Sequence, residues 1–251
     1  MKKILSLMAV LALAVTMIAG CGKTENADNL VIGYTIYEPM NYMEDGKLTG
    51  FDTEFAEAVC QKLGVTPEFV EINWDTKFVT LDANKIDCIW NGMTISEDVK
   101  ANCIVSDAYV KNAQVVVMKE DAIDNYKDVE SLKALKFAAE AGSAGETAIK
   151  ENGLDANYNP VAAQTDALLA VAGGQADDCV IDITMAKTMT ADGTSYEDLT
   201  YSLELTSEEY GIGFRKADTE LKDKVNAAIK ELNEDGTLPA LAEKYGLNLA
   251  F

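Results

Sequence analysis

The sequence reads Asn84-Lys85-Ile86-Asp87-Cys88-Ile89 after a predicted helix, and a similar stretch, Gly174-Gln175-Ala176-Asp177-Asp178-Cys179-Val180, follows another predicted helix. Each stretch is a polar turn that leads into an apolar strand. Two copies of one helix–turn–strand unit, about 90 residues apart, indicate two similar lobes rather than one large sheet.

Strands and helices alternate on both sides of this repeat, which predicts parallel α/β sheets. Strands are predicted at 30–32, 66–72, 86–90, 136–139 and 179–181, and helices from Asp52 to Leu63, from 75 onward, at 145–152 and at 165–172. Asp52 and Asp75 are expected to cap the first two helices. A long helix from Asp218 to about Asn233 and a short helix that ends at Gly246 close the chain.

Two apolar stretches, 115–118 and 211–214, are predicted to be strands that cross between the lobes. The first lobe is then discontinuous and comprises residues 29–116 plus 213–251. The second lobe comprises residues 117–212, with the crossings at its ends.

Composition excludes several classes of function. The 251 residues include 42 acidic and 21 basic side chains, a formal net charge of −21, and such a surface repels nucleic-acid phosphates. The sequence has no histidine, which excludes Ser-His-Asp triads and His-ligated metals. The spacing of Cys60, Cys88, Cys103 and Cys179 matches no metal-ligand pattern, and we expect buried free thiols rather than disulfides. No metal or cofactor is expected.

The amino terminus has the pattern of a secretory signal. Lys2 and Lys3 precede an apolar run over residues 4–19 that is too short to span a bilayer comfortably. The run ends in Ile18-Ala19-Gly20-Cys21, which resembles the bacterial lipobox. Residues 1–20 are therefore predicted to be a lipoprotein signal peptide, Cys21 an acylated first residue that anchors the protein outside the cytoplasm, and 21–28 a tether. An ordinary signal peptide with an incidental cysteine is the alternative.

Short motifs follow one another in a distinctive order along the rest of the chain. They are Tyr37-Glu38-Pro39-Met40, Gly50-Phe51-Asp52, Trp74-Asp75, Lys85-Ile86-Asp87, Gly92-Met93-Thr94-Ile95-Ser96, Ser106-Asp107-Ala108-Tyr109, Gly142-Ser143, Asp182 and Tyr210-Gly211-Ile212. In this order and spacing the chain resembles the extracellular solute-binding proteins of polar amino-acid ABC transporters, bacterial family 3.

The resemblance implies a two-lobed periplasmic-binding-protein-like α/β fold of type II, with a two-strand hinge and a ligand cleft between the lobes. It also implies a function: a monomer that captures a small polar solute, first of all an amino acid, and delivers it to an ABC transporter permease.

In the first lobe, the resemblance matches Tyr37 and Trp74 to aromatic walls of the cleft; for Trp74, filling the core is the alternative. Asn91, Gly92 and Thr94 follow the predicted strand at 86–90, where open α/β sheets bind ligands. Gly92 would let the backbone approach the ligand, and the Thr94 hydroxyl would bind a carboxylate or cap a helix.

In the second lobe, Ser143 and the amides at the start of the helix near Glu146 are expected to face the same carboxylate. The resemblance matches Asp182 to the family's ammonium-binding aspartate, and a cap for the helix from Ile183 is the alternative. Glu140 adds negative charge near the expected cleft.

One departure concerns the grip on the ligand carboxylate. The family usually has an arginine where this chain has Val99, and Ala144 replaces a threonine of the second lobe. Either Lys100 or Lys111 compensates, or the ligand is cationic or not a standard α-amino acid. A lyase similar to cyclohexadienyl dehydratase, with Glu140 or Asp182 as the acid, is the enzymatic alternative.

We predict that Cys21→Ser abolishes acylation and leaves unlipidated precursor, because the lipobox cysteine carries the lipid. Labelling with a radioactive fatty acid and membrane fractionation would measure this. A variant that is still cleaved before residue 21 and extracts like the wild type would contradict the prediction.

Overall fold

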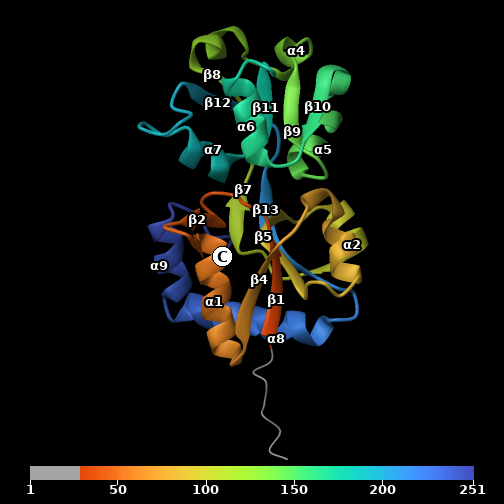
Figure 1. Ribbon diagram of the computed structural model, residues 1–251, viewed down its shortest axis with the longest axis vertical. Helices are drawn as coiled ribbons and strands as arrows, with labels where there is room; N and C mark the ends of the chain where they lie inside the picture. Colours follow the sequence, from red (N-terminus) through yellow and green to blue (C-terminus); the bar gives the residue numbers. More distant parts are fainter. Residues whose placement is uncertain (1–28) are drawn as a thin grey trace, which may run out of the picture.

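The structure, a computed structural model, describes residues 29–251. These residues form two lobes that lie end to end and are joined by two chain segments (Figure 1). The predicted signal peptide, the tether and Cys21 lie outside the described residues.

The first lobe is built on a mixed sheet with the strand order β4-β1-β5-β13-β6, and β7 also pairs with β13. Strand β1 is parallel to β4 and β5, whereas β13 is antiparallel to β5, β6 and β7. The strands are β1 (Asn29–Tyr34), β4 (Thr66–Glu71), β5 (Cys88–Thr94), β6 (Ile104–Val105), β7 (Val110–Asn112) and β13 (Glu208–Phe214); β2 (Tyr42–Glu44) and β3 (Lys47–Thr49) form a small hairpin.

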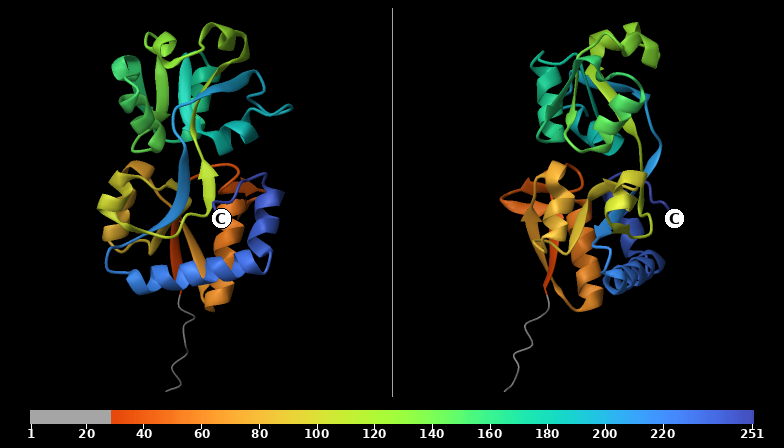
Figure 2. Two further views of the ribbon diagram at one scale, coloured as in Figure 1. Left: turned by 180° about the vertical axis from the view of Figure 1, so that it is seen from behind. Right: turned by 90° about the vertical axis from the view of Figure 1, so that its right-hand side faces the viewer.

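Helices from both ends of the described chain cover this sheet. Helix α8 packs against α1, α9 and β6, so the carboxyl-terminal segment belongs to the first lobe (Figure 2). The helices are α1 (Phe51–Leu63), the 3₁₀ turn η1 (Trp74–Thr76), α2 (Lys77–Asp82), α3 (Glu97–Asn102), α8 (Thr219–Glu234) and α9 (Thr237–Lys244).

The second lobe has a five-stranded sheet with the order β10-β9-β11-β8-β12. Strands β9, β10 and β11 are parallel, and β8 is antiparallel to β11 and β12. The elements are β8 (Gln114–Lys119), η2 (Glu120–Asn125), α4 (Val129–Leu132), β9 (Phe137–Glu140), α5 (Ala144–Glu151), η3 (Asp155–Asn157), β10 (Tyr158–Val161), α6 (Gln164–Ala172), β11 (Asp178–Asp182), α7 (Ile183–Met189) and β12 (Leu199–Glu204).

Both sheets are mixed, which corrects the prediction of parallel sheets. In each sheet, the antiparallel strand is one that continues from a crossing: β8 in the second lobe and β13 in the first. A strand that arrives from the other lobe runs against the strands of the local βαβ units, which are parallel because helices connect them.

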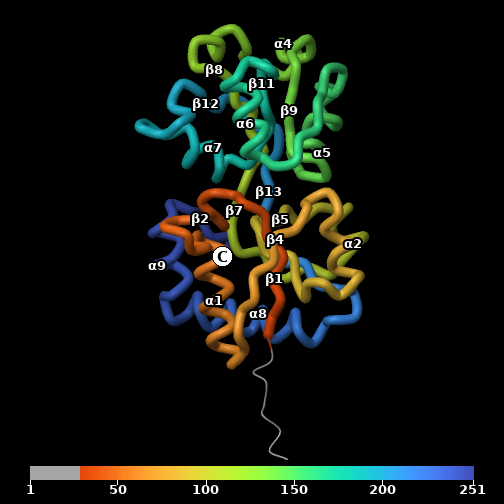
Figure 3. Tube along the Cα trace, in the orientation of Figure 1, coloured from red at the N-terminus to blue at the C-terminus, as the bar shows by residue number. Residues whose placement is uncertain are grey.

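The crossings between the lobes lie before the predicted apolar strands. The first is at Ala113, between Asn112 at the end of β7 and Gln114 at the start of β8, and the second is at residues 205–207, between β12 and β13 (Figure 3). Residues 114–116 thus belong to the second sheet and 208–212 to the first, and both predicted lobe boundaries were too late. The apolar stretch 115–118 is fully buried, because such residues are stabilised inside a lobe.

The predicted caps at Asp52 and Asp75 were wrong. Gly50 is the residue before α1, and the buried Asp52 carboxylate accepts hydrogen bonds from the Gly92 amide (2.6 Å) and the Tyr109 hydroxyl (3.0 Å). Asn73 caps the turn at Trp74 by accepting from the Thr76 amide. Asp52, which the local pattern predicted to cap a helix, therefore forms hydrogen bonds with residues far away in the sequence instead.

The four cysteines at positions 60, 88, 103 and 179 are buried free thiols, which confirms the prediction made for them. Within residues 29–251, no helix combines the length and the apolar character needed to cross a membrane.

We predict that Phe55→Ala lowers the free energy of unfolding by about 3–5 kcal/mol. Phe55 has no solvent exposure and packs edge-on against Trp90, with ring centroids 5.1 Å apart, so the truncation leaves a cavity. Urea denaturation would measure the change. Leu169→Ala is the control, since Leu169 is 59% exposed and its loss should cost little; equal effects of the two substitutions would contradict this packing.

Candidate functional site

A cavity of ≈ 270 Å³ lies between the two lobes, and residues of both lobes line it. The first lobe contributes Trp74, Lys77, the end of β5 and the start of α3. The second lobe contributes the end of β9, the start of α5, Gln164 and Asp182. Cavities of about this size hold small molecules.

Trp74 and Lys77 form one wall of this cavity. Lys77 is only 5% exposed, and its ammonium lies 4.7 Å from the centroid of the Trp74 ring. The ammonium donates hydrogen bonds to the Trp74 carbonyl (3.2 Å) and, across the cavity, to the Gly142 carbonyl of the second lobe (2.8 Å). Burial lowers the pKa of Lys77, while the nearby charge of Glu140 acts to raise it.

Glu140 lies on the opposite wall, at the end of β9. It is 3% exposed, and its Oε1 atom has no hydrogen-bond partner within the described chain. Burial raises the pKa of Glu140 to about 8, and repulsion from Asp182 adds to the shift. A carboxyl in this state is poised to accept a donor or a positive charge from a ligand.

Asp182 lies at the end of β11 and is held by four donors from the protein. Its Oδ1 atom accepts from Asn112 (2.5 Å), Gln114 (2.8 Å) and Tyr210 (2.8 Å), and its Oδ2 atom accepts from Gln164 (2.5 Å). Its side chain makes no cap bond to α7, so the helix-cap alternative is wrong.

Glu208 accepts from two of the same donors, the amide nitrogens of Asn112 and Gln114. Burial, followed by the charge of Glu208, raises the pKa of Asp182.

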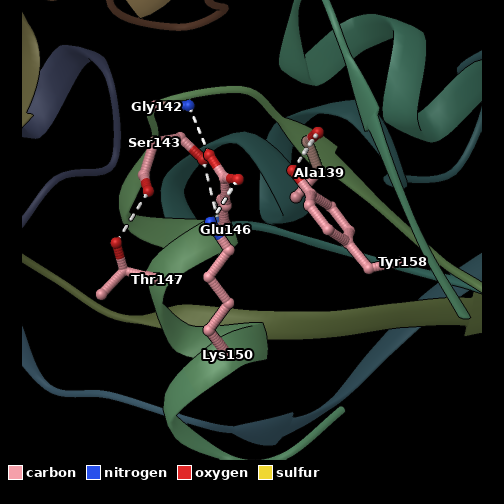
Figure 4. Close-up of polar contacts among 7 residues, drawn as sticks. All are labelled: Ala139, Gly142, Ser143, Glu146, Thr147, Lys150 and Tyr158. Carbon is pink, nitrogen blue, oxygen red and sulfur yellow. Dashed lines mark hydrogen bonds and ion pairs between the residues drawn. The ribbon is translucent and has the colours of Figure 1, made fainter. Parts of the chain in front are cut away.

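The start of α5 is already organised by its own side chains (Figure 4). The Ser143 hydroxyl accepts from the Glu146 amide (3.1 Å), and the Glu146 carboxylate accepts from the Gly142 amide (2.6 Å) and pairs with Lys150. Two of the amides expected to face a ligand carboxylate are therefore occupied. The Ser143 hydroxyl lines the cavity and keeps its own hydrogen as a donor.

Asn91, Gly92 and Thr94 also line the cavity, but they are part of β5 rather than residues that follow it. The Asn91 side chain bonds to Thr35 and Asn41, and the Thr94 hydroxyl donates to Glu208 (2.7 Å). In this structure the side chains of Asn91 and Thr94 are therefore hydrogen-bonded within the first lobe.

Gly92 has a packing role in addition to lining the cavity. Its φ is 55°, and a Cβ atom there would lie 2.7 Å from the Tyr37 ring. Its missing side chain makes room for Tyr37, and its amide donates to Asp52.

Tyr37 does not line the cavity. It is 2% exposed, and its hydroxyl bonds to Thr184 of the second lobe and to Tyr210 (2.5 Å). The flat ring expected to cover a ligand is instead buried between the two lobes, because Gly92 opens a space for it.

The position of the missing arginine, Val99, lines the cavity with an apolar side chain. Neither proposed substitute reaches it: Lys100 is exposed and pairs with Glu97, and Lys111 lines a different hollow. The cation that lies in the cavity is Lys77, which the sequence reasoning missed. Its spacing of three residues from Trp74 was an available signal, since residues i and i+3 lie on one helical face.

The family model and the relatives found by comparison all belong to the same class of solute-binding proteins. The family model for bacterial extracellular solute-binding proteins, family 3, matches residues 30–248. The L-cystine-binding protein TcyJ of Escherichia coli (strain K12) is 30% identical over 257 residues, which cover 96% of this chain and 94% of the relative. An L-arginine-binding protein of Pseudomonas aeruginosa is 31% identical, and the alignment covers 98% of this chain and 96% of the relative.

A solved structure with the same fold is that of AncCDT-1, an ancestral amino acid-binding protein and a precursor of cyclohexadienyl dehydratase. It superposes with a TM-score of 0.80 at 32% identity and covers 86% of this chain and 95% of the other. The two-lobed α/β architecture predicted from the sequence is therefore confirmed.

We predict that the free energy of unfolding falls between about pH 6 and about pH 8. Burial raises the pKa of Asp52 to about 7 and of Glu140 to about 8, and it also raises that of Asp182. The unfolded chain has released these protons by about pH 6, so the folded state binds more protons in this window and its stability falls as pH rises.

Glu140→Gln removes one of the titrating groups and should make the fall shallower, by up to about 1.4 kcal/mol per pH unit. Urea denaturation across this pH range would measure the slopes. Glu130→Gln, at a side chain that is 78% exposed, should keep the wild-type slope; an unchanged slope in Glu140→Gln would contradict the prediction.

Proposed function

The chain belongs to the bacterial extracellular solute-binding proteins of family 3, and on that premise we propose that it captures an amino acid outside the cytoplasm and delivers it to an ABC transporter permease. The relatives named above bind L-cystine and L-arginine. The proposed ligand of this chain is therefore an amino acid.

The observation that carries this proposal is the charge arrangement of the cavity. A buried cation, Lys77, lies on one lobe, and two buried acids, Glu140 and Asp182, lie on the other. An amino acid carries a carboxylate and an ammonium, and opposite charges on opposite walls suit such a zwitterion because buried charges need partners. Trp74 would cover the ligand's side chain, and Ser143 would donate to its carboxylate.

Closure of the lobes around the ligand follows from the same arrangement. A hydrogen bond from Lys77 to Gly142 and one between the Tyr37 and Thr184 hydroxyls connect the lobes in the present structure. A ligand that contacts both walls binds the closed arrangement better than an open one, and only such a difference in affinity shifts the population toward closure.

The protein is further proposed to act as a monomer that is held at the outer face of the cell membrane by lipid on Cys21. The lipobox-like stretch before that cysteine supports the anchor. A lipid anchor would keep the binding protein close to its permease and raise its effective concentration there.

A lyase is the second candidate function, and one observation favours it. Glu140, with its pKa raised to about 8, stays largely protonated at neutral pH and could act as a general acid, and AncCDT-1 is a precursor of such an enzyme. Incubation with a cyclohexadienyl acid, followed by ultraviolet absorbance of the aromatic product, tests it. Turnover that Glu140→Gln abolishes would favour the lyase, whereas the binding role predicts none.

Isothermal titration calorimetry with the L-amino acids and L-cystine tests the binding role. We expect at least one of them to bind, with its D-enantiomer weaker, because fixed charges on both walls select one arrangement of the groups around the α-carbon. Absence of binding across the whole set would overturn the proposed function.

We predict that Asp182→Asn weakens binding of the best ligand by about 2–5 kcal/mol. Asparagine removes the negative charge and turns one oxygen, which now accepts from protein donors, into a nitrogen. Calorimetry would measure the loss, and a thermal melt would show that the variant is folded at the assay temperature. Asp192→Asn, at an exposed position, makes the same charge change and should leave affinity unaltered; equal affinities of both variants would contradict a role for Asp182.

A further inference from the structure

Two ionisable groups in the cavity are buried without an ion-pair partner. Lys77 and Glu140 take part in none of the ion pairs found within residues 29–251, although each is at most 5% exposed. Buried charges are costly unless they are paired. A ligand could therefore supply the opposite charges that the protein does not place beside Lys77 and Glu140.

Lys77 retains a donor for this purpose. A lysine ammonium has three N–H groups, and the two hydrogen bonds to the Trp74 and Gly142 carbonyls leave one. Both of these acceptors are neutral, so no carboxylate is in direct contact with the ammonium. The Trp74 ring and the two carbonyls fix the position of the ammonium, which gives a flexible side chain one defined location.

Glu140 retains an acceptor. Its Oε1 atom is buried and unpartnered, in contrast to Asp182, whose carboxylate already accepts four hydrogen bonds. Glu140 is therefore the acid of the cavity that lacks a partner, and Asp182 is largely satisfied by neutral donors.

The charges along the cavity wall do not balance. Lys77 is the one basic residue among those that line the cavity, and it faces the two buried acids Glu140 and Asp182. The exposed acids Glu97, Asp98 and Glu151 also line the cavity and add negative potential, while the apolar Val99 supplies no second cation. A ligand with one carboxylate and two positive groups would pair with Lys77 and with the ionised forms of both buried acids, whereas a simple zwitterion would leave one of these acids without a partner.

Building on the proposed role in amino-acid binding, we propose that Lys77 and Glu140 determine the ligand class: Lys77 holds the ligand carboxylate, and Glu140 holds a positive group in addition to the one at Asp182. The ligand is then a dibasic amino acid. In this proposal Lys77, in α2, binds the ligand carboxylate, which the apolar Val99, in α3 of the same lobe, is unable to bind.

Matched ligands test this in the wild-type protein. L-Citrulline has the shape of L-arginine without the side-chain charge, and agmatine is arginine without the carboxylate. Calorimetry should show that L-arginine or L-lysine binds best among the amino acids, and that citrulline and agmatine each bind roughly 30-fold more weakly than arginine, or weaker still.

Variants then connect each preference to one residue. Glu140→Gln should abolish the preference for arginine over citrulline and keep the preference for arginine over agmatine. Lys77→Met should do the reverse, and Lys77→Arg, which keeps the charge, should restore the carboxylate preference. Glu130→Gln and Lys100→Met, at exposed positions, are the matched controls and should behave like the wild type.

The wild-type ligand series tests the inference even if a variant does not fold. A neutral or acidic amino acid as the best ligand would overturn this inference and leave the proposed binding function intact. Preferences that persist in both Glu140→Gln and Lys77→Met would also overturn it. Absence of binding by every amino acid would overturn the inference and the proposed function together.

Discussion

The Asp182 carboxylate is the interaction on which the arrangement of the two lobes depends. It accepts from Asn112 and Gln114 at the first crossing, from Tyr210 in the sheet of the first lobe and from Gln164 within the second lobe. One buried anion thus connects the passage between the lobes to the cores on both sides. In a region of low dielectric these charge-assisted bonds are strong, and loss of one leaves a costly unpaired group.

The second crossing is tied to the same network through Glu208, which accepts from Asn112, Gln114 and Thr94. Two carboxylates therefore share their donors at the point where the chain passes between the lobes. The passages carry the polar side chains Asn112, Gln114 and Thr206 beside the apolar Ala113 and Leu205. These polar side chains can exchange hydrogen bonds with water when the lobes move, which a packed apolar core cannot do without a large cost.

The cavity differs from this network in one respect that matters for function. At the crossings every carboxylate has donors from the protein, whereas on the cavity walls Lys77 and Glu140 are buried without counter-charges. Burial disfavours the charged form of each group, and the proposed ligand would offset this cost by pairing with them. Gly92 and Tyr37 pack next to the cavity. The absence of a Cβ atom at Gly92 leaves space for the Tyr37 ring, whose hydroxyl bonds to Thr184 and Tyr210.

Periodicity and short motifs were sufficient to predict the two lobes, the order of most strands and helices, the buried free thiols and several of the residues that line the cavity, among them Trp74, Glu140, Ser143 and Asp182. These features follow from local patterns in the chain. The contacts of each polar side chain were decided by the tertiary structure: Asp52 bonds to Gly92 and Tyr109 instead of capping a helix, Tyr37 is buried between the lobes, and Lys77 rather than Lys100 enters the cavity. Local pattern could not reveal the contacts of Asp52 and Tyr37, because a buried polar group pairs with whatever the fold brings near it, and the side-chain partners of these two residues lie 40 or more residues away along the chain. For Lys77 the spacing from Trp74 was a local signal, but its bond to the Gly142 carbonyl joins residues 65 positions apart and depends on the fold.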